Sequence, residues 1–423
     1  MQVLGHALGH APGQTLSHAL RQALGHALGH ALRHAPSLAL ACAAGLLGSA
    51  SPALSATLTV WPGQSLAQAV QRAADGDTIE LQAGDHRGQT AVILQRRLTL
   101  RGVGGRPVLH ADGQHAEGKA LLVVRQGDVW IDNIEFRGAR VPDGNGAGIR
   151  FERGRLRVTR CVFIDNQNGI LTANFGDAEL SVHDSEFGAA PAGTTLPHLL
   201  YVGRIARFEL QGSRLSGGRE GHLLKSRARV NEIFYNHLVD GPQGRAAYEM
   251  EFPNGGLAYV VGNVMGQGPN IGNPALLAFG AEGQPPESAE AAPRAHGLFL
   301  VNNTFVNDAL WPAAFVRVFE HKLQGKVDRV MVNNLFVGLG GADGAWNDSA
   351  SGNQQATRAQ LRDPEGGDFS LKADSVRRGR GVEPDTMLST AGRALAPKAE
   401  FVPPLGTREL APRLRWSPGA HQE

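Results

Sequence analysis

The chain has 423 residues, and its 41 Lys and Arg against 39 Asp and Glu give a formal net charge of only +2. This near balance argues against a dedicated nucleic-acid groove, which needs a clustered excess of basic side chains. Charged residues make up 19% of the chain and Gly contributes 55 residues, a composition that excludes both a coiled coil and a disordered polyelectrolyte. We therefore expect a globular chain rich in turns, with no nucleic-acid partner.

Residues 1–56 have the pattern of an export signal preceded by a His-rich leader. Gly-His-Ala-Leu units repeat near the start, and an uncharged apolar run then extends from Ser37 to Leu47. Small residues around Ala50 and Ala56 offer cleavage points. The apolar run is too short to span a membrane. We expect a periplasmic or secreted protein without a membrane span. We interpret the His-rich leader as the result of a start site placed too early in the sequence, rather than as a metal-binding tract.

The next segment predicts one short amphipathic helix from Ser65 to Ala74, with Ser65 as its N-cap. Beyond the export signal, Cys161 is the only cysteine, so no disulfide can form within the exported chain. Cys161 lies in a strand-like stretch, and we interpret it as a small buried apolar residue rather than a nucleophile.

From residue 78 onward, a unit recurs in which alternating aliphatic residues lead to a polar residue and then to a large apolar one. The clearest units end at Phe136, Phe163, Phe187, Leu215, Leu238, Phe305 and Phe336. Their early spacings of about 23 to 28 residues match one coil of a solenoid. A single coil cannot bury its apolar face, so stacked coils with ladders of Asn and aliphatic side chains are expected. We predict a β-helix over residues 57–338 and a C-terminal cap and tail over residues 339–423.

Two stretches carry a family resemblance, the segment from Asp75 to Gly84 and the segment Leu98-Thr-Leu-Arg-Gly-Val-Gly-Gly105. Both are typical of the pectate-lyase-like superfamily, and the resemblance covers essentially all of the chain after the export signal. It implies an all-β fold, a right-handed parallel β-helix solenoid with a short N-terminal capping helix. The superfamily includes lyases, hydrolases, epimerases, esterases and catalytically silent adhesins, so the resemblance implies a fold rather than an activity.

Polar residues gather on the strands of five consecutive coils. A spacing of about 24 residues aligns outward-facing side chains in columns, because side chains alternate along a strand. One predicted column contains Tyr201, Lys225 and Glu249, the next contains Gly203, Arg227 and Glu251, and Leu200, Leu224 and Met250 point inward. We therefore expect an outward patch of two cations and two carboxylates, flanked by Tyr201 and Glu282.

Such a patch suits β-elimination from a uronate-containing polysaccharide. Lys225 is the predicted base, with its pKa lowered by a neighbouring cation such as Arg227, while Glu249 and Glu251 could hold a calcium ion. Tyr248, His222 or Tyr201 would donate a proton to the leaving oxygen. Tyr201, Glu249, Glu251, Asn254 and Glu282 form the predicted substrate-binding set.

The stretch from Gly218 to Ser226 resembles the active-site coil of the chondroitinase B and alginate lyase family, in which a calcium-binding Glu precedes the catalytic Lys by the same interval. The resemblance implies that Glu220 binds calcium and that Lys225 is catalytic. The chain departs from the family twice. Gly218 stands where the family has another Glu, and the next coil reads Tyr248-Glu-Met-Glu-Phe252 where the family has an Arg.

Two alternatives to catalysis remain open at this stage. The charged residues can form a salt-bridge ladder that only satisfies adjacent coils, and the whole protein can be a noncatalytic glycan-binding or structural surface rod. His198 and His222 occupy equivalent coil positions on the side of Leu200 and Leu224, and we interpret them as packed, hydrogen-bonded imidazoles rather than metal ligands. We expect a monomer whose partner is a polysaccharide.

Overall fold

The computed structural model describes residues 55–193, 196–284, 293–343, 351–384, 387–389, 391–413 and 415–422. The predicted export signal lies almost wholly outside the described residues and stays a prediction. Most of the segment over residues 284–294, which the sequence marks as a polar, Pro-rich insertion, also lies outside the described residues. None of the helices among the described residues is long and apolar enough to cross a membrane.

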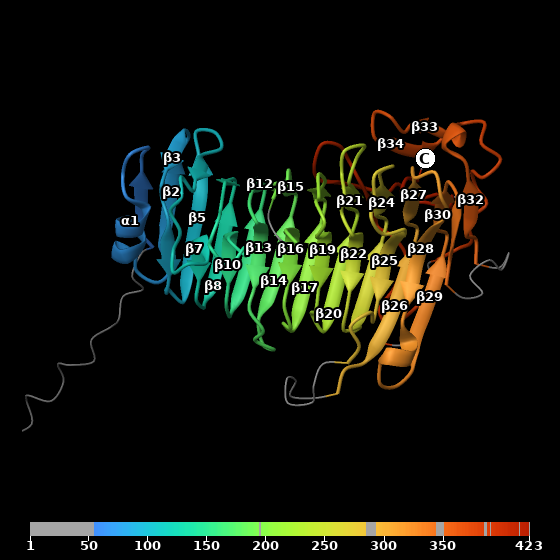
Figure 1. The fold of residues 1–423 in the computed structure, drawn as a ribbon, viewed down its shortest axis with the longest axis horizontal. Coiled ribbons are helices and arrows are strands. Elements are labelled where there is room, and N and C mark those ends of the chain that lie inside the picture. Colours follow the sequence, from blue (N-terminus) through green and yellow to red (C-terminus); the bar gives the residue numbers. More distant parts are fainter. Residues whose placement is uncertain are drawn as a thin grey trace, which may run out of the picture. The chain divides into compact units, whose positions relative to one another are not determined.

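Three parallel sheets, whose strands run from β1 to β32, form a β-solenoid (Figure 1). Sheet A contains β1 (Thr57–Val60), β2 (Thr78–Gln82), β5 (Arg97–Val103), β8 (Asp128–Asp132), β11 (Arg155–Thr159), β14 (Glu179–His183), β17 (Arg207–Gln211), β20 (Val230–Phe234), β23 (Leu257–Val261), β26 (His296–Val301) and β29 (Val327–Val332). Sheet B contains β3 (Asp85–Arg87), β6 (Val108–His110), β9 (Glu135–Arg137), β12 (Val162–Ile164), β15 (Glu186–Gly188), β18 (Arg214–Leu215), β21 (His237–Val239), β24 (Val264–Gln267), β27 (Thr304–Asn307), β30 (Leu335–Val337) and β32 (Gln354–Ala356).

Sheet C, which carries the predicted site, contains β4 (Ala91–Ile93), β7 (Ala120–Val124), β10 (Ala147–Phe151), β13 (Asn168–Thr172), β16 (His198–Val202), β19 (His222–Ser226), β22 (Tyr248–Phe252), β25 (Ala275–Phe279), β28 (Ala313–Val318) and β31 (Gly340–Ala342). In sheet C, as in the other two sheets, each strand pairs in parallel with the strand one coil further along the chain. The predicted parallel β-helix is therefore confirmed. Its last strands, β31 and β32, lie past residue 338.

Additional elements cover the first coil and two outer faces of the solenoid. Helix α1 (Leu66–Arg72) packs against β1 and β4, and the Ser65 Oγ accepts a hydrogen bond from the Gln68 amide at 3.2 Å, as predicted for an N-cap. The hairpin of β33 (Leu361–Asp363) and β34 (Asp368–Leu371) packs on sheet B. The hairpin of β35 (Ala399–Phe401) and β36 (Thr407–Glu409) belongs to a tail that packs on sheet A. Two short 3-10 helices, η2 (Glu320–Lys322) and η3 (Arg358–Gln360), lie in connections.

The interior contains the row of large apolar residues that the repeating unit predicts. Strand pairing in sheet B aligns Phe136, Phe163, Phe187, Leu215, Leu238, Met265, Phe305 and Phe336. Phe163 stacks between Phe136 and Phe187, with ring centroids 5.0 and 4.6 Å apart. Cys161 is also fully buried, and burial raises the pKa of its thiol to about 12, which confirms its role as a packing residue.

The corner between sheets A and B has a constant geometry because side-chain amides link successive coils there. Each amide nitrogen in the series donates to the amide oxygen of the next coil at 3.0–3.1 Å, and the series is Asn236, Asn263, Asn303, Asn334 and Asn353. The residue before each of the first four ladder positions has a left-handed backbone, including Tyr235 (φ 56°) and Asn302 (φ 53°). The predicted Asn ladder is thus confirmed, and it sets the register of the strands on either side.

The corner between sheets B and C varies in length. The connection before β19 runs over residues 216–221, the one before β22 over residues 240–247, and the one before β25 over residues 268–274. A constant sequence period therefore does not hold across this corner.

We expect Asn303→Ala to destabilise the solenoid. Asn303 is fully buried, its amide nitrogen donates to the Val260 carbonyl at 2.8 Å, and its amide oxygen accepts from both Asn263 nitrogens at 3.0 and 3.1 Å. Each orphaned buried group costs roughly 1–3 kcal/mol, so the free energy of unfolding should fall by at least about 2 kcal/mol. Chemical denaturation measures the loss. The control is Asn270→Ala, because Asn270 is exposed and outside the ladder; equal losses in the two variants would contradict a special role for the ladder.

Candidate functional site

Strand pairing places the predicted site residues in a register that differs from the expected one. Tyr201 pairs with Lys225, as predicted, but Lys225 then pairs with Glu251 and not with Glu249. The connection over residues 240–247 is longer than the one over residues 216–221, so the spacing of about 24 residues fails between β19 and β22. The predicted pairing of Arg227 with Glu251 is wrong for the same reason.

Glu249 lies in the interior, which corrects its predicted outward placement. The pairing of sheet C aligns it with Gly148, Gly169, Leu223 and Leu276. A side chain on Gly148 would meet the Phe136 Cβ and the Phe163 ring, so this row faces the core. Glu249 is 1% exposed, and neither carboxyl oxygen has a hydrogen-bond partner among the described residues. Glu249 and Met250 both face inward, so the strict alternation assumed from the sequence breaks at the start of β22.

Lys225, Arg227 and Glu282 form the centre of a network on the outer face of sheet C. The Lys225 Nζ lies 2.7 Å from the Glu282 Oε1 and 3.0 Å from the Glu251 Oε2. The Arg227 guanidinium lies 2.6 Å from the Glu282 Oε2. The two oxygens of one carboxylate therefore bridge two cations. The predicted proximity of Glu282 to the patch is confirmed.

Arg227 also contacts the two uncharged residues of the predicted binding set. Its Nε donates to the Tyr201 hydroxyl and its NH1 to the Asn254 Oδ1, each at 2.9 Å. Asn254 in turn donates to the Gly283 carbonyl at 2.9 Å. These contacts hold the plane of the guanidinium in one orientation, beside the Tyr201 ring.

The two histidines continue the network away from Lys225. The His222 Nε2 lies 3.0 Å from the Glu251 Oε2, and its Nδ1 lies 3.0 Å from the Nδ1 of His198. The Tyr248 ring stacks on His222 with centroids 5.2 Å apart. The prediction of packed, hydrogen-bonded imidazoles is confirmed, but the rings lie on the same side as Lys225 rather than on the side of Leu200 and Leu224.

Burial and charge pairing determine the protonation states. Burial by itself would lower the pKa of Lys225, but Glu251 and Glu282 more than offset it and raise that pKa above its usual value. The predicted lowering by Arg227 is therefore wrong in this arrangement. Burial opposes ionisation of Glu282 as well, yet Arg227 and Lys225 lower its pKa to about 2. Burial, together with the nearby His222 and Lys225, holds the pKa of His198 well below its usual value.

The three carboxylates predicted to bind calcium do not come together. Glu249 lies in the core, Glu251 on the outer face contacts His222 and Lys225, and Glu220 is an exposed residue on the turn before β19. Calcium needs several convergent oxygen ligands, and the described part of the chain contains no group of three or more His, Cys, Asp or Glu side chains arranged for a metal. These residues do not fit a calcium site as they stand.

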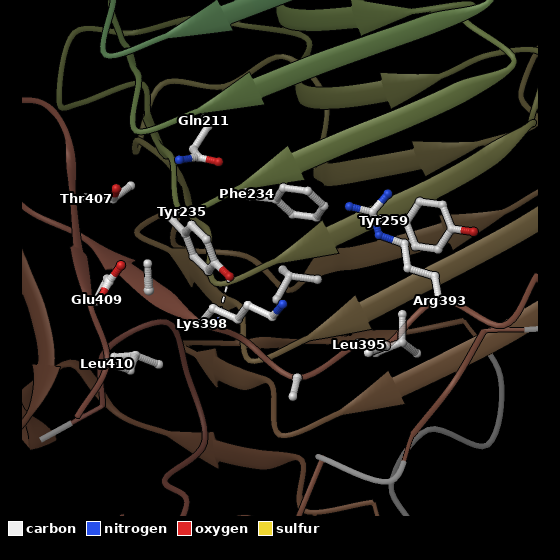
Figure 2. A pocket seen from close by; sticks show the side chains of 14 residues that line it. Gln211, Phe234, Tyr235, Tyr259, Arg393, Leu395, Lys398, Thr407, Glu409 and Leu410 are labelled. Atoms are coloured by element: carbon white, nitrogen blue, oxygen red, sulfur yellow. Dashed lines mark hydrogen bonds between the residues drawn. The ribbon is translucent and has the colours of Figure 1, made fainter. Parts of the chain in front are cut away.

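Two cavities lie away from this network. One, of about 720 Å³, lies between sheet A and the tail, where Arg393 lies over the rings of Phe234 and Tyr259 and the Tyr235 hydroxyl accepts from the Lys398 amide at 2.8 Å (Figure 2). The other, of about 810 Å³, lies between sheet B and the β33–β34 hairpin. Sequence reasoning missed both, because each joins residues more than a hundred positions apart and no local pattern indicates such a contact.

Comparisons with known proteins support the fold. No protein-family model matches the chain, and no curated protein matches it. Among solved structures, the crystal structure of pectate lyase Pel9A is similar, with a TM-score of 0.50 and 14% identity over 80% of this chain and 95% of that chain. The structure of the PL6 family alginate lyase AlyGC gives a TM-score of 0.41 and 16% identity over 65% of this chain and 40% of that chain. At such identities the likeness to Pel9A concerns the fold alone, which agrees with the predicted resemblance.

We expect Glu249→Met to stabilise the protein at neutral pH. The row around Glu249 is apolar, and an unsatisfied buried polar group costs roughly 1–3 kcal/mol. Burial and the nearby Asp240 raise the Glu249 pKa well above 4.5. The contribution of Glu249 to wild-type stability is thus fully present below the unfolded-state pKa of about 4.5, and it is lost as the pH rises through the folded-state pKa. The gain from Met should be smallest near pH 4 and should grow toward pH 7, as measured by denaturant unfolding at each pH.

The control for this variant is Glu220→Gln, because Glu220 is an exposed carboxylate on the neighbouring coil. It should leave the pH profile of stability unchanged. A Met variant that is less stable than wild type at pH 7, or a gain that does not vary with pH, would show that Glu249 does not carry a buried proton.

Proposed function

We propose that this protein is an exported polysaccharide lyase that cleaves a uronate-containing polymer by β-elimination at Lys225 and Arg227. One observation carries the proposal. Lys225 and Arg227 on the outer face of sheet C share the carboxylate of Glu282, and the Arg227 guanidinium also donates a hydrogen bond to a tyrosine hydroxyl. The solenoid fold and its likeness to a pectate lyase support it but do not define the substrate.

The reaction needs three tasks, and the network offers a side chain for each. A base removes the proton on the carbon beside the uronate carboxyl group, the bond to the neighbouring sugar oxygen breaks, a carbon–carbon double bond forms, and the leaving oxygen takes a proton. Arg227 suits neutralisation of the carboxylate, because its guanidinium is always charged and already contacts one carboxylate oxygen, that of Glu282. Neutralisation acidifies the adjacent carbon, and preorganised charge of this kind is a large part of catalysis.

Lys225 remains the proposed base, with one condition set by the structure. In the arrangement described, two carboxylates hold it as a cation. A general base must give up that proton first, so only the fraction of complexes in which Lys225 has lost its proton can react. Tyr201 suits the acid role, because its hydroxyl accepts a hydrogen bond from Arg227 and so keeps its own proton for a leaving oxygen.

A noncatalytic glycan-binding role is the second candidate, and the charge balance of the network favours it. Two cations face two carboxylates, and Lys225 is 8% exposed. Such a closed network resembles a structural ion-pair cluster as much as a reactive site. Binding of a polymer without cleavage would support this candidate.

We expect wild-type protein to form ultraviolet-absorbing unsaturated products from at least one of alginate, chondroitin, pectin and hyaluronan. Lys225→Ala should reduce the rate by a factor of about 10² or more, since it removes the proposed base. Parallel assays with added calcium and with a chelator test whether the reaction needs the metal.

The control is Lys372→Ala, because Lys372 is exposed and lies in the C-terminal segment, outside sheet C. It should retain the wild-type rate. The lyase proposal falls if no polymer yields unsaturated products, or if Lys225→Ala and Lys372→Ala have the same rate.

A further inference from the structure

We propose that Lys225 and Arg227 form a carboxylate clamp and that Glu282 occupies this clamp as an internal ligand, which the carboxylate of a bound uronate displaces. The inference rests on the proposed function for the class of ligand, and it goes further by naming the group that the clamp recognises and the side chain that must leave.

The geometry is that of a ligand carboxylate rather than of an ordinary surface ion pair. The Glu282 Oε1 lies 2.7 Å from the Lys225 Nζ, and the Oε2 lies 2.6 Å from the Arg227 guanidinium. Each oxygen therefore has its own cation. The carboxylate of a sugar acid has the same planar pair of oxygens and can make the same two contacts.

Exposure separates the clamp from its occupant. The side chains of Lys225 and Arg227 are only 10% and 14% exposed, while that of Glu282 is 42% exposed. Further contacts hold the two cations, Glu251 on Lys225 and both Tyr201 and Asn254 on Arg227. Among the described residues, the Glu282 carboxylate forms ion pairs only with the two clamp residues. The clamp is thus prebuilt, and its occupant is the member that can leave.

The backbone around Glu282 is fixed, so the side chain alone can make the change. The Gly280 amide donates to the Phe252 carbonyl at 2.8 Å, and the Glu282 amide donates to the Pro253 carbonyl at 2.9 Å. The Gly283 carbonyl accepts from Asn254 at 2.9 Å. Rotation about the side-chain bonds of Glu282 would carry its carboxylate into solvent while these hydrogen bonds stay in place.

The exchange avoids the main cost of opening a buried ion pair. Removing one partner of such a pair is destabilising because it leaves an uncompensated buried charge. When a ligand carboxylate replaces the Glu282 carboxylate, Lys225 and Arg227 remain paired with a carboxylate in the complex. The leaving carboxylate is partly exposed already and regains water at little cost. Selectivity then follows from charge, since an uncharged sugar cannot replace Glu282.

The experiment is calorimetric titration of the full chain with the methyl glycosides of glucuronate and galacturonate. Both Glu282→Gln and Glu282→Ala should bind at least one of these probes about tenfold more tightly than wild type, because an internal occupant reduces apparent affinity by the fraction of time that the clamp is open. The methyl esters of the same probes, which lack the charge, should show no gain. Adding Arg227→Gln to Glu282→Gln should abolish it.

The matched control is Glu320→Gln, because the Glu320 side chain is also 42% exposed and pairs with an arginine, Arg329, outside the network. It should bind like wild type. Equal or weaker uronate binding by both Glu282 variants would overturn the inference, because it would make Glu282 part of the binding surface rather than its occupant. A gain seen only with a sulfated neutral sugar would overturn the assignment to carboxylates.

The outcomes separate this inference from the proposed lyase activity. A gain in uronate affinity without any unsaturated product supports the clamp and removes the lyase. Product formation by wild type without a gain in either Glu282 variant keeps the lyase and removes the clamp. Thermal unfolding of each variant checks that a loss of binding does not reflect a loss of fold.

Discussion

The asparagine ladder at the corner between sheets A and B is the constraint on which the rest of the solenoid depends. Buried amides that donate to the next coil and accept from the preceding one leave only one register in which every polar group is satisfied. The left-handed residues before the first four ladder positions turn the chain sharply enough to start sheet B. Sheet B then stacks its large apolar side chains in one row, so the ladder and the core define the same register.

Because the corner between sheets A and B is constant, the connections at the corner between sheets B and C can vary in length. The connections between sheets B and C differ in length from coil to coil, and sheet C begins wherever each connection ends. The longer connection over residues 240–247 places Glu251 beside Lys225 and turns Glu249 into the core. A functional surface built after a variable corner can thus change its residues without disturbing the ladder. Here the same change leaves one carboxyl group in an apolar row.

The sequence predicted the features that depend on its repeating pattern, and it did not predict those that depend on connection length or on long-range contacts. The recurring apolar and Asn positions predicted the parallel coils and the interior row ending at Phe336. The segment from Ser65 to Ala74 predicted the N-cap at Ser65. Each of these features depends on local pattern. The sequence also predicted the proximity of Lys225 and Glu282, since Glu282 follows a strand of sheet C only two coils after that of Lys225. The pairing of Lys225 with Glu251 was not predicted, because it depends on the length of one turn. The contacts of Arg393 with sheet A have no local signature at all.

The network around Lys225 combines two demands that usually conflict. Buried charges need partners at all times, whereas a binding site needs groups that are free to contact a ligand. Two carboxylates of different burial reconcile these demands. Glu251, at 3% exposure, is the buried partner of Lys225, and Glu282 is the more exposed partner, which a uronate would displace in the proposed clamp. The charge on Lys225 and Arg227 is therefore balanced both without and with an anionic sugar. On this view the ion-pair network is the resting form of the binding site, so the structural and functional interpretations of these residues describe one arrangement in two states.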